Sequence, residues 1–386
     1  MLTSAKNTAA RTSRSLTRPQ AFCAGAHAVL SWPWVQNIVH PNAVETCLTA
    51  LHPMWSLSSV RAKVVAIRDE TARDETADCK TFVLQTNALW RGARAGQFVR
   101  VMVEIDGRRV ERAYSLSQID GSQIGNNRIA ISVKRQGKVS GHIHQSWQVG
   151  TVVSISQAAG DFVLPALVLP EKILLLSAGS GITPMLAMLA QLQVQHYQGS
   201  VVLLHICRSP EQFIFARRLQ QMAQQFPALR IITFFSADSG RWNANNLPEM
   251  VPDLAQRSTW ICGPGEMMAQ IEQLWHRLAI PAALHSERFT AAPILPAQAL
   301  GTSVAVQCTS SAKQFTSNGT EPLLLQAERA GLTPKHGCRI GICHSCQCIK
   351  TSGTVENLQT GEMNAEPGQL IRMCISAARS ELVLAI

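Results

Sequence analysis

Four cysteines near the end of the chain have the type and spacing of metal ligands. Cys338, Cys343 and Cys346 follow the pattern C-x4-C-x2-C, and Cys374 lies further along the sequence. This is the plant-type spacing for a [2Fe–2S] cluster, in which four thiolates hold two irons. Gly341 lets the loop backbone turn, which brings amide N–H groups toward the sulfurs. The spacing therefore predicts an iron–sulfur centre in this loop.

The other cysteines do not extend this pattern. A structural zinc site usually has two C-x2-C pairs, whereas this loop has one, so we expect Cys348 and Cys308 to be bystanders. The chain has 11 cysteines, an odd number, and its start shows no clean signal peptide. We therefore expect metal binding in a reducing compartment rather than a set of disulfides.

A glycine-rich turn in the middle of the chain has the features of a phosphate site. The apolar run Lys172–Leu176 leads into it, and the turn carries Gly179, Gly181, Thr183 and Pro184. Glycines allow a tight turn and the close approach of a phosphate, and a helix N-terminus favours an anion. A purely structural turn is the alternative. Pro184, early in the predicted helix, favours the nucleotide site.

The residues after the next predicted strand bear on the choice of nucleotide. Arg208 stands where folds that prefer NAD often place an acid. Arg217 and Arg218 follow on the next predicted helix. These cations would suit a 2′-phosphate, so NADPH is favoured over NADH. The alternative is that Arg217 and Arg218 line a solvated helix face.

A second possible ligand site lies earlier, among short predicted strands. Arg112, Tyr114 and Ser115 form a basic–aromatic–hydroxyl motif, for which, taken alone, an amphipathic strand is the favoured interpretation. A further turn follows another predicted strand and contains Gly137, Val139 and Ser140. The glycine-rich turn then begins the next region at a suitable distance, and this order favours a ligand site.

Two patterns of predicted secondary structure position these motifs. Short strands over 62–67, 80–85, 97–103, 128–134 and 152–155 predict a small antiparallel β-barrel. Strands then alternate with helices, the helices over 184–195, 211–225 and 265–278 and the strands over 201–206, 230–235 and 259–262. Such alternation predicts an α/β doubly wound parallel sheet. The last region predicts a hairpin over 303–316 and a helix over 322–330.

Changes of composition and clusters of proline divide the chain. We expect an N-terminal extension over 1–58, the β-barrel over 59–166, the α/β domain over 167–292, a linker over 293–300 and a third domain over 301–386. The extension has the composition of a transit peptide. The alternative, which we favour, is a disordered tail followed by a short helix over 43–51.

Charge and hydropathy argue against a nucleic-acid partner and against a transmembrane helix. The formal net charge is +10, and residues 1–44 contribute four basic side chains and no acid. No basic run interleaved with aromatics is present, so we expect no nucleic-acid partner. No stretch of eighteen uninterrupted apolar residues is present, which argues against a transmembrane helix.

Together these motifs resemble the ferredoxin–NADP⁺ reductase family, in the form with a plant-type ferredoxin at its C-terminus. The resemblance covers about residues 60–386 and includes the segment Cys262–Met267. It implies a flavin-binding β-barrel, an NAD(P)-binding α/β domain and an α+β ferredoxin domain of the β-grasp type. The order is similar to phthalate dioxygenase reductase. The segments Trp90–Arg100 and Gly341–Val355 most resemble reductases that serve bacterial acyl-CoA or fatty-acid desaturases.

The resemblance also implies roles for the motif residues. Tyr114 would pack against the isoalloxazine, and Ser115 would form a hydrogen bond near the reactive flavin nitrogen. Arg112 would neutralise a flavin phosphate. The turn Gly137–Ser140 would cover the pyrophosphate of a dinucleotide, which favours FAD over FMN.

A cysteine–glycine–proline turn and an acidic segment complete the implied site. Cys262 would lie beside the nicotinamide, where Gly263 and Pro264 shape the turn. A buried structural cysteine is the alternative. A catalytic role for Glu287 is doubtful, because the chain continues well beyond the point at which the family's reductase domain ends.

The implied activity is that of an NAD(P)H-dependent oxidoreductase. NAD(P)H would give two electrons to the flavin, and the flavin would pass them singly to the cluster and an external acceptor. A membrane di-iron fatty-acyl desaturase is the first acceptor considered. The alternatives are a soluble ring-hydroxylating or other multicomponent oxygenase, and a redox sensor without turnover. We expect a cytoplasmic monomer whose basic extension gives weak peripheral association with the membrane.

Overall fold

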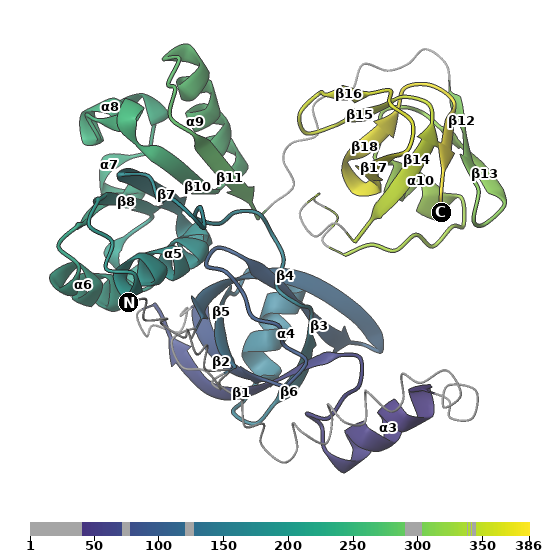
Figure 1. Cartoon of the computed structure of the whole chain (residues 1–386), viewed down its shortest axis with the longest axis horizontal. Helices are drawn as coiled ribbons and strands as arrows, with labels where there is room; N and C mark the ends of the chain where they lie inside the picture. Colours follow the sequence, from purple (N-terminus) through teal and green to yellow (C-terminus); the bar gives the residue numbers. More distant parts are fainter. Residues whose placement is uncertain are drawn as a thin grey trace, which may run out of the picture.

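A computed structural model describes residues 41–71, 78–119, 127–289, 303–337, 339, 341 and 345–386. The ribbon shows a barrel, a parallel sheet flanked by helices, and a smaller C-terminal unit (Figure 1). This is the predicted fold class, and it is confirmed.

The barrel is closed and antiparallel, with the strand order β1-β2-β5-β4-β3-β6. Its strands are β1 (Val60–Asp69), β2 (Cys79–Thr86), β3 (Phe98–Ile105), β4 (Arg108–Ile119), β5 (Arg128–Lys134) and β6 (Val152–Ile155). Alternate Val, Ile, Leu and Phe side chains fill its interior, as strand periodicity requires. Helix α4 (Lys138–Ser146) adds Val139 and Ile143 to this core. The sequence predicts a turn at Gly137–Ser140, and the structure instead begins α4 there.

The parallel sheet has the order β11-β10-β7-β8-β9 and helices on both faces. Its strands are β7 (Lys172–Ala178), β8 (Ser200–Cys207), β9 (Leu229–Phe235), β10 (Ser258–Gly263) and β11 (Leu284–Arg288). Helices α5 (Ile182–Val194) and α6 (Ala216–Gln225) cover one face; α7 (Ser236–Ser239), α8 (Leu247–Met250) and α9 (Gly265–Arg277) complete the unit. Helix α6 begins later than predicted, because Phe215 is left-handed with φ +66° and interrupts a helix over 211–225.

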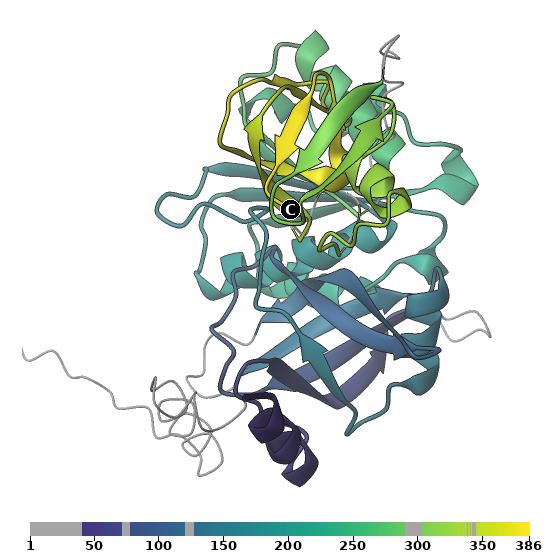
Figure 2. The ribbon, with the colours of Figure 1, turned by 90° about the vertical axis from the view of Figure 1, so that its right-hand side faces the viewer.

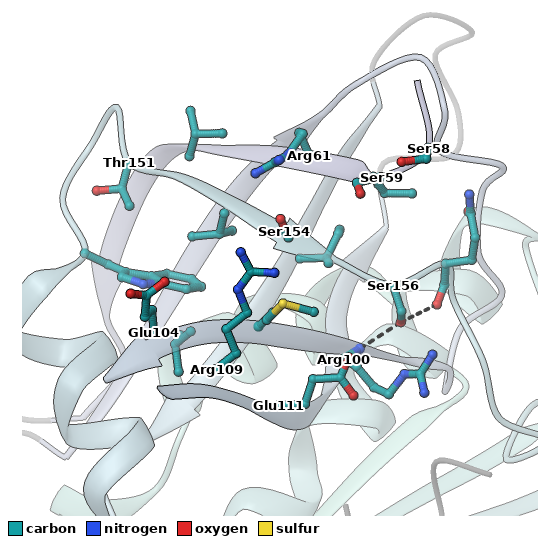
Figure 3. A pocket seen from close by; sticks show the side chains of 18 of the residues that line it. Ser58, Ser59, Arg61, Arg100, Glu104, Arg109, Glu111, Thr151, Ser154 and Ser156 are labelled. Carbon is teal, nitrogen blue, oxygen red and sulfur yellow. Dashed lines mark hydrogen bonds between the residues drawn. The ribbon is translucent and has the colours of Figure 1, made fainter. Parts of the chain in front are cut away.

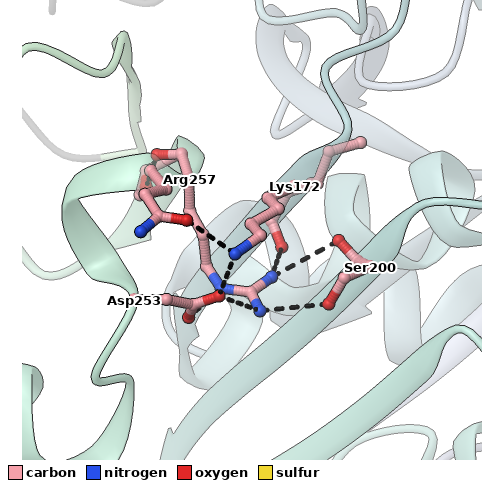
Figure 4. A network of polar contacts seen from close by, with 7 residues as sticks. Lys172, Ser200, Asp253 and Arg257 are labelled. Carbon is pink, nitrogen blue, oxygen red and sulfur yellow. Dashed lines mark hydrogen bonds and ion pairs between the residues drawn. The ribbon is translucent and has the colours of Figure 1, made fainter.

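A buried arginine joins the start of the parallel strands to the loop before β10 (Figure 4). The guanidinium of Arg257 donates to both carboxylate oxygens of Asp253, at 2.6 and 2.9 Å. It also donates to the carbonyl oxygen of Ile173 at 3.1 Å and to the carbonyl and hydroxyl oxygens of Ser200. Lys172 reaches the same carboxylate from the surface at 3.1 Å. The contacts of Arg257 satisfy a charge that would otherwise be costly to bury.

The C-terminal unit is a mixed sheet of order β13-β12-β19-β14-β17 with helix α10 (Leu323–Arg329) packed against it. Its strands are β12 (Val304–Cys308), β13 (Lys313–Ser317), β14 (Gln347–Ser352), β17 (Gln369–Arg372) and β19 (Leu382–Leu384). A second small sheet contains β15 (Val355–Asn357), β16 (Met363–Asn364) and β18 (Ser376–Ala378). Strand β12 runs parallel to β19, and the other pairs are antiparallel.

Helix α3 (Pro41–Leu51) lies at the end of the barrel that faces away from the parallel sheet (Figure 2). The carboxylate of Glu45 accepts a hydrogen bond from the backbone N–H of Leu57 at 2.8 Å, which ties the helix to the segment before β1. The basic residues predicted to meet a membrane lie outside the described residues. Within those residues, no helix is long and apolar enough to cross a membrane.

Candidate functional site

A cavity of about 640 Å³ lies between the barrel and the C-terminal edge of the parallel sheet. Most of the residues predicted to bind flavin or nucleotide line it: Arg112, Tyr114, Ser115, Gly137, Val139, Ser140, Gly179, Gly181, Thr183, Gly263 and Pro264. Three other predicted residues are not in its lining. Pro184 and Cys262 are buried in α5 and β10, and Arg208 is exposed after the end of β8.

Strand β4 supplies the barrel wall of the cavity. Burial raises the pKa of the Tyr114 hydroxyl to about 12, although the charge of Arg112 opposes this, so the phenol is neutral at pH 7. Arg112 is exposed, and its guanidinium donates to the carbonyl oxygen of Glu111 at 2.8 Å. A flat neutral ring therefore lies two residues from an exposed cation on the same wall.

The N-terminus of α4 faces the same cavity. The hydroxyl oxygen of Ser140 accepts from the backbone N–H groups of Gln136 and Gly137, at 2.9 and 3.0 Å. The space beside Gly137 is open, since an added Cβ would meet no atom within 4 Å. Ser140 thus orders the turn, and the start of the helix stays accessible to an anion.

The glycine-rich turn lies opposite, between β7 and α5. Gly179 has φ +53°, a left-handed conformation that suits glycine, and its Cβ position is open. Gly181 is required for a different reason, since an added Cβ would lie 2.1 Å from the carbonyl oxygen of Cys262. The hydroxyl of Thr183 donates to the carbonyl oxygen of Ser180 at 2.9 Å. The turn therefore packs directly on β10 and leaves the N-terminal end of α5 facing the cavity.

A buried serine–glutamate–cysteine group lies where the two walls meet. Glu287 on β11 pairs in register with Cys262 on β10, and its carboxylate accepts from the Ser115 hydroxyl at 3.4 Å. Burial raises the pKa of Glu287 to about 8, which the hydrogen bond from Ser115 lowers in part. Burial raises the pKa of Cys262, and the negative charge that Glu287 carries once it is ionised raises this pKa further. The thiol is therefore neutral, as a packing and shaping residue would be.

Glu287 and Phe289 are the site residues that sequence reasoning undervalues. The continuation of the chain beyond Glu287 argues against a role for it, yet Glu287 is buried against Ser115. Phe289, two residues on, lines the cavity. The available signal is the segment His285–Phe289 itself, an acid followed by an aromatic residue at the end of the last parallel strand.

The donor set of the cavity fits a flavin dinucleotide beside a nicotinamide nucleotide. It offers an aromatic ring, a guanidinium and two helix N-termini that can receive phosphates. Such a flavin, when bound, exchanges two electrons with a nicotinamide and single electrons with a metal centre. The chain itself supplies the two walls of the cavity and a carboxyl at Glu287 that mostly retains its proton at neutral pH, because burial raises its pKa to about 8.

The predicted cluster ligands are described in part. Cys346 and Cys374 are buried, and their sulfur atoms lie 3.1 Å apart, close enough to share one metal ion. Cys338 and Cys343 lie outside the described residues, within which no group of three or more potential ligands is found. Burial raises the pKa of the nearby Cys348 to about 12, so that thiol stays neutral.

Three domain families match the chain in the order of its structural units. The oxidoreductase FAD-binding domain matches residues 69–164, and the oxidoreductase NAD-binding domain matches residues 175–273. The 2Fe-2S iron-sulfur cluster binding domain matches residues 306–379. FAD, a nicotinamide nucleotide and a [2Fe–2S] cluster are therefore its cofactors, as predicted.

Relatives match over nearly the whole chain. The NADPH oxidoreductase of Mycobacterium tuberculosis is 31% identical over 352 residues, which are 91% of this chain and 90% of the relative. The glycine betaine monooxygenase reductase subunit of Chromohalobacter salexigens is 27% identical over 384 residues, and the match covers 90% of this chain and 99% of the relative. The fold resembles the crystal structure of phthalate dioxygenase reductase, with a TM-score of 0.57 and 24% sequence identity. The match covers 85% of this chain and 98% of that reductase. The chain therefore belongs to the ferredoxin–NADP⁺ reductase family, as an NAD(P)H-dependent oxidoreductase with a C-terminal plant-type [2Fe–2S] ferredoxin domain.

Proposed function

We propose that this chain is the reductase component of an oxygen-activating system. It takes electrons from NADPH and delivers them, through FAD and the [2Fe–2S] cluster, to a separate acceptor protein. The observation that carries the proposal is the shared cavity, where the flavin motif of β4 faces the nucleotide turn after β7. Several relatives are named as reductase components of monooxygenases, which supports an acceptor of this kind.

The predicted site residues have the following roles in this proposal. Tyr114 stacks on the flavin ring, Ser115 bonds near its reactive nitrogen, and Arg112 with the start of α4 holds the phosphates. Gly179, Gly181 and Thr183 hold the nucleotide phosphates, while Cys262, Gly263 and Pro264 shape the nicotinamide pocket. The cluster ligands are Cys338, Cys343, Cys346 and Cys374.

NADPH is the proposed reductant because of a cation at the end of β8. Arg208 is exposed there, and its carbonyl oxygen accepts from the backbone N–H of Ala237 at 2.9 Å, which fixes its position. A guanidinium at this place can pair with a 2′-phosphate through charge-assisted hydrogen bonds. The name of the Mycobacterium tuberculosis relative, an NADPH oxidoreductase, supports the same choice.

The first candidate acceptor is a membrane di-iron fatty-acyl desaturase, which the reductase would contact at the cytoplasmic face of the membrane. Its support is the likeness of the segments Trp90–Arg100 and Gly341–Val355 to desaturase reductases, together with four basic residues and no acid in residues 1–44. The second candidate is a soluble multicomponent oxygenase. The names of the glycine betaine and 3-ketosteroid monooxygenase reductases favour this second acceptor.

A reconstitution experiment distinguishes between the two candidate acceptors. The holoprotein and a variant that lacks residues 2–44 are mixed with NADPH and either desaturase-containing membranes or a purified soluble oxygenase component. The desaturase proposal expects equal dye reduction by both proteins but slower desaturation by the shortened one at low salt. Rapid reduction of the oxygenase component without desaturation by either protein would assign the second acceptor.

A further inference from the structure

A hydrogen bond joins Ser345, in the C-terminal unit, to the outside of the barrel. Nη1 of Arg100, on β3, donates to the hydroxyl oxygen of Ser345. Ser345 directly precedes Cys346, whose sulfur lies 3.1 Å from that of Cys374. A cation of the barrel therefore holds the residue next to a predicted cluster ligand, although the two residues are 245 positions apart in sequence.

The register of the barrel places this contact beside the cofactor cavity. Arg100 pairs across the β3–β4 ladder with Ala113, which lines the cavity. The preceding residue of β3 pairs with Tyr114, the aromatic residue of the flavin motif. Paired residues of neighbouring antiparallel strands are about 4.5–5.5 Å apart at Cα. Ser345 is thus held one strand away from the wall of the flavin site.

The base of the Arg100 side chain is held firmly. Its backbone N–H donates to the hydroxyl of Ser156 at 2.9 Å (Figure 3). Its carbonyl oxygen accepts from the backbone N–H of Ser156, also at 2.9 Å. Strand β3 lies between β4 and β6 in the closed barrel. Because the backbone is fixed and the side chain is half-buried, little further ordering is needed when the guanidinium meets Ser345.

We propose that Arg100 is a positioning residue for electron transfer between the flavin and ferredoxin domains. The step it serves moves one electron between two centres and forms or breaks no covalent bond, so its rate depends steeply on their separation. Tethering keeps the two domains at high effective concentration, and the contact with Ser345 selects the arrangement in which the residue beside Cys346 lies against β3. This role is independent of which protein finally receives the electrons.

The test uses the holoprotein and the variants Arg100→Ala, Ser345→Ala and the double variant. NADPH-driven reduction of a two-electron dye, which requires only the flavin, stays at the wild-type rate. Reduction of cytochrome c, which requires the cluster, falls about tenfold in each single variant, the size expected for loss of a charged hydrogen bond. The double variant falls no further than either single one, since both remove the same contact.

Two readouts besides activity show that the effect is one of position. The electron paramagnetic resonance signal of the reduced cluster keeps its intensity in every variant. Hydrogen exchange speeds up in the peptide that contains Ser345, and Arg100→Lys, which keeps a donor, restores part of the protection. Loss of the cluster signal in both Arg100→Ala and Ser345→Ala would overturn the proposal in favour of a role in cluster assembly.

Arg109→Ala is the matched control. Arg109 lies on β4 of the same barrel, is exposed, and lines the same surface pocket as Arg100, near Glu104 and Ser154 (Figure 3). Its removal takes away the same charge without touching Ser345, so cytochrome c reduction stays at the wild-type rate. An equal loss in Arg109→Ala would show a general charge effect. A loss in the double variant equal to the product of the two single losses would show that Arg100 and Ser345 act independently, and either result would overturn the proposal.

Discussion

The hydroxyl of Ser115 donates to a carboxyl oxygen of Glu287 across 3.4 Å and joins the barrel strand β4 to the last parallel strand, β11. Both residues are buried, and Glu287 lies in register opposite Cys262. The segments that carry Ser115 and Cys262, which are far apart in the sequence, therefore meet at one carboxyl group. Its raised pKa, about 8, means that this group is uncharged at pH 7.

Glu287→Gln should remove a pH dependence of stability. The folded protein keeps the Glu287 proton up to about pH 8, whereas the unfolded chain releases it near the ordinary value of 4.5. The folded state then binds more protons between these values, so wild-type stability falls as pH rises through this window, by about 1.4 kcal/mol per pH unit at most. Calorimetry should show the stability advantage of Glu287→Gln growing from about pH 5 to 8 and then levelling.

Glu249→Gln provides the baseline for this experiment, because Glu249 is an exposed carboxylate on α8 and the chemical change is the same. If the difference between Glu287→Gln and wild type does not vary with pH, the carboxyl is not held protonated in the folded protein.

Arg257→Met should destabilise the parallel sheet. The substitution leaves the carbonyl oxygens of Ile173 and Ser200 without their donor and deprives Asp253 of its principal partner. Breaking a buried ion pair costs about 3–5 kcal/mol, and the cost here should be nearer 2–3 because the side chain of Asp253 is 31% exposed. Denaturant unfolding measures the loss.

The effect of Arg257→Met should shrink in acid. The hydrogen bond from Arg257, aided by Lys172, lowers the pKa of Asp253, so this contribution is present above the unfolded value and is lost as pH falls through the folded one. Lys172→Ala is the control: it removes a partly exposed ion pair and should cost less than about 1 kcal/mol. Equal losses in the two variants would contradict a special role for Arg257.

The parts of this protein that could be predicted from sequence are those whose functional residues lie close together in the sequence at a characteristic spacing. The C-x4-C-x2-C loop and the glycine turn after an apolar run each carry their chemistry within about ten residues. Glu287 and Arg100 acquire their partners only through tertiary structure, with Ser115 from another domain and Ser345 from a third. The helix predicted over 211–225 is longer than the observed one. The left-handed conformation of Phe215 interrupts the helical pattern there, and helical periodicity in the sequence does not reveal that conformation.

Arg208→Ala should weaken binding of NADPH and leave NADH nearly unchanged. A charge-assisted hydrogen bond is worth roughly 1.5–3 kcal/mol, which corresponds to about one to two decades in affinity. Steady-state kinetics with each nucleotide measures the shift. Arg230→Ala is the control, because Arg230 is exposed near the start of β9, the strand next to β8, and therefore lies toward the other end of the strands from Arg208. A wild-type protein that already uses NADH better than NADPH would refute the proposal.

Two neighbouring buried cysteines give the sharpest test of the cluster ligands. Cys346 and Cys348 are two residues apart and similarly buried, but only the Cys346 sulfur lies beside that of Cys374. Cys346→Ser should abolish the iron–sulfur signal in electron paramagnetic resonance and stop cytochrome c reduction. Dye reduction should continue, because the flavin site between β4 and the glycine turn is built from other residues. Cys348→Ser should keep two irons per chain and both activities, since its neutral thiol serves packing. Loss of iron in Cys348→Ser with retention in Cys346→Ser would reverse the ligand assignment and would make Cys348, rather than Cys346, the partner of Cys374.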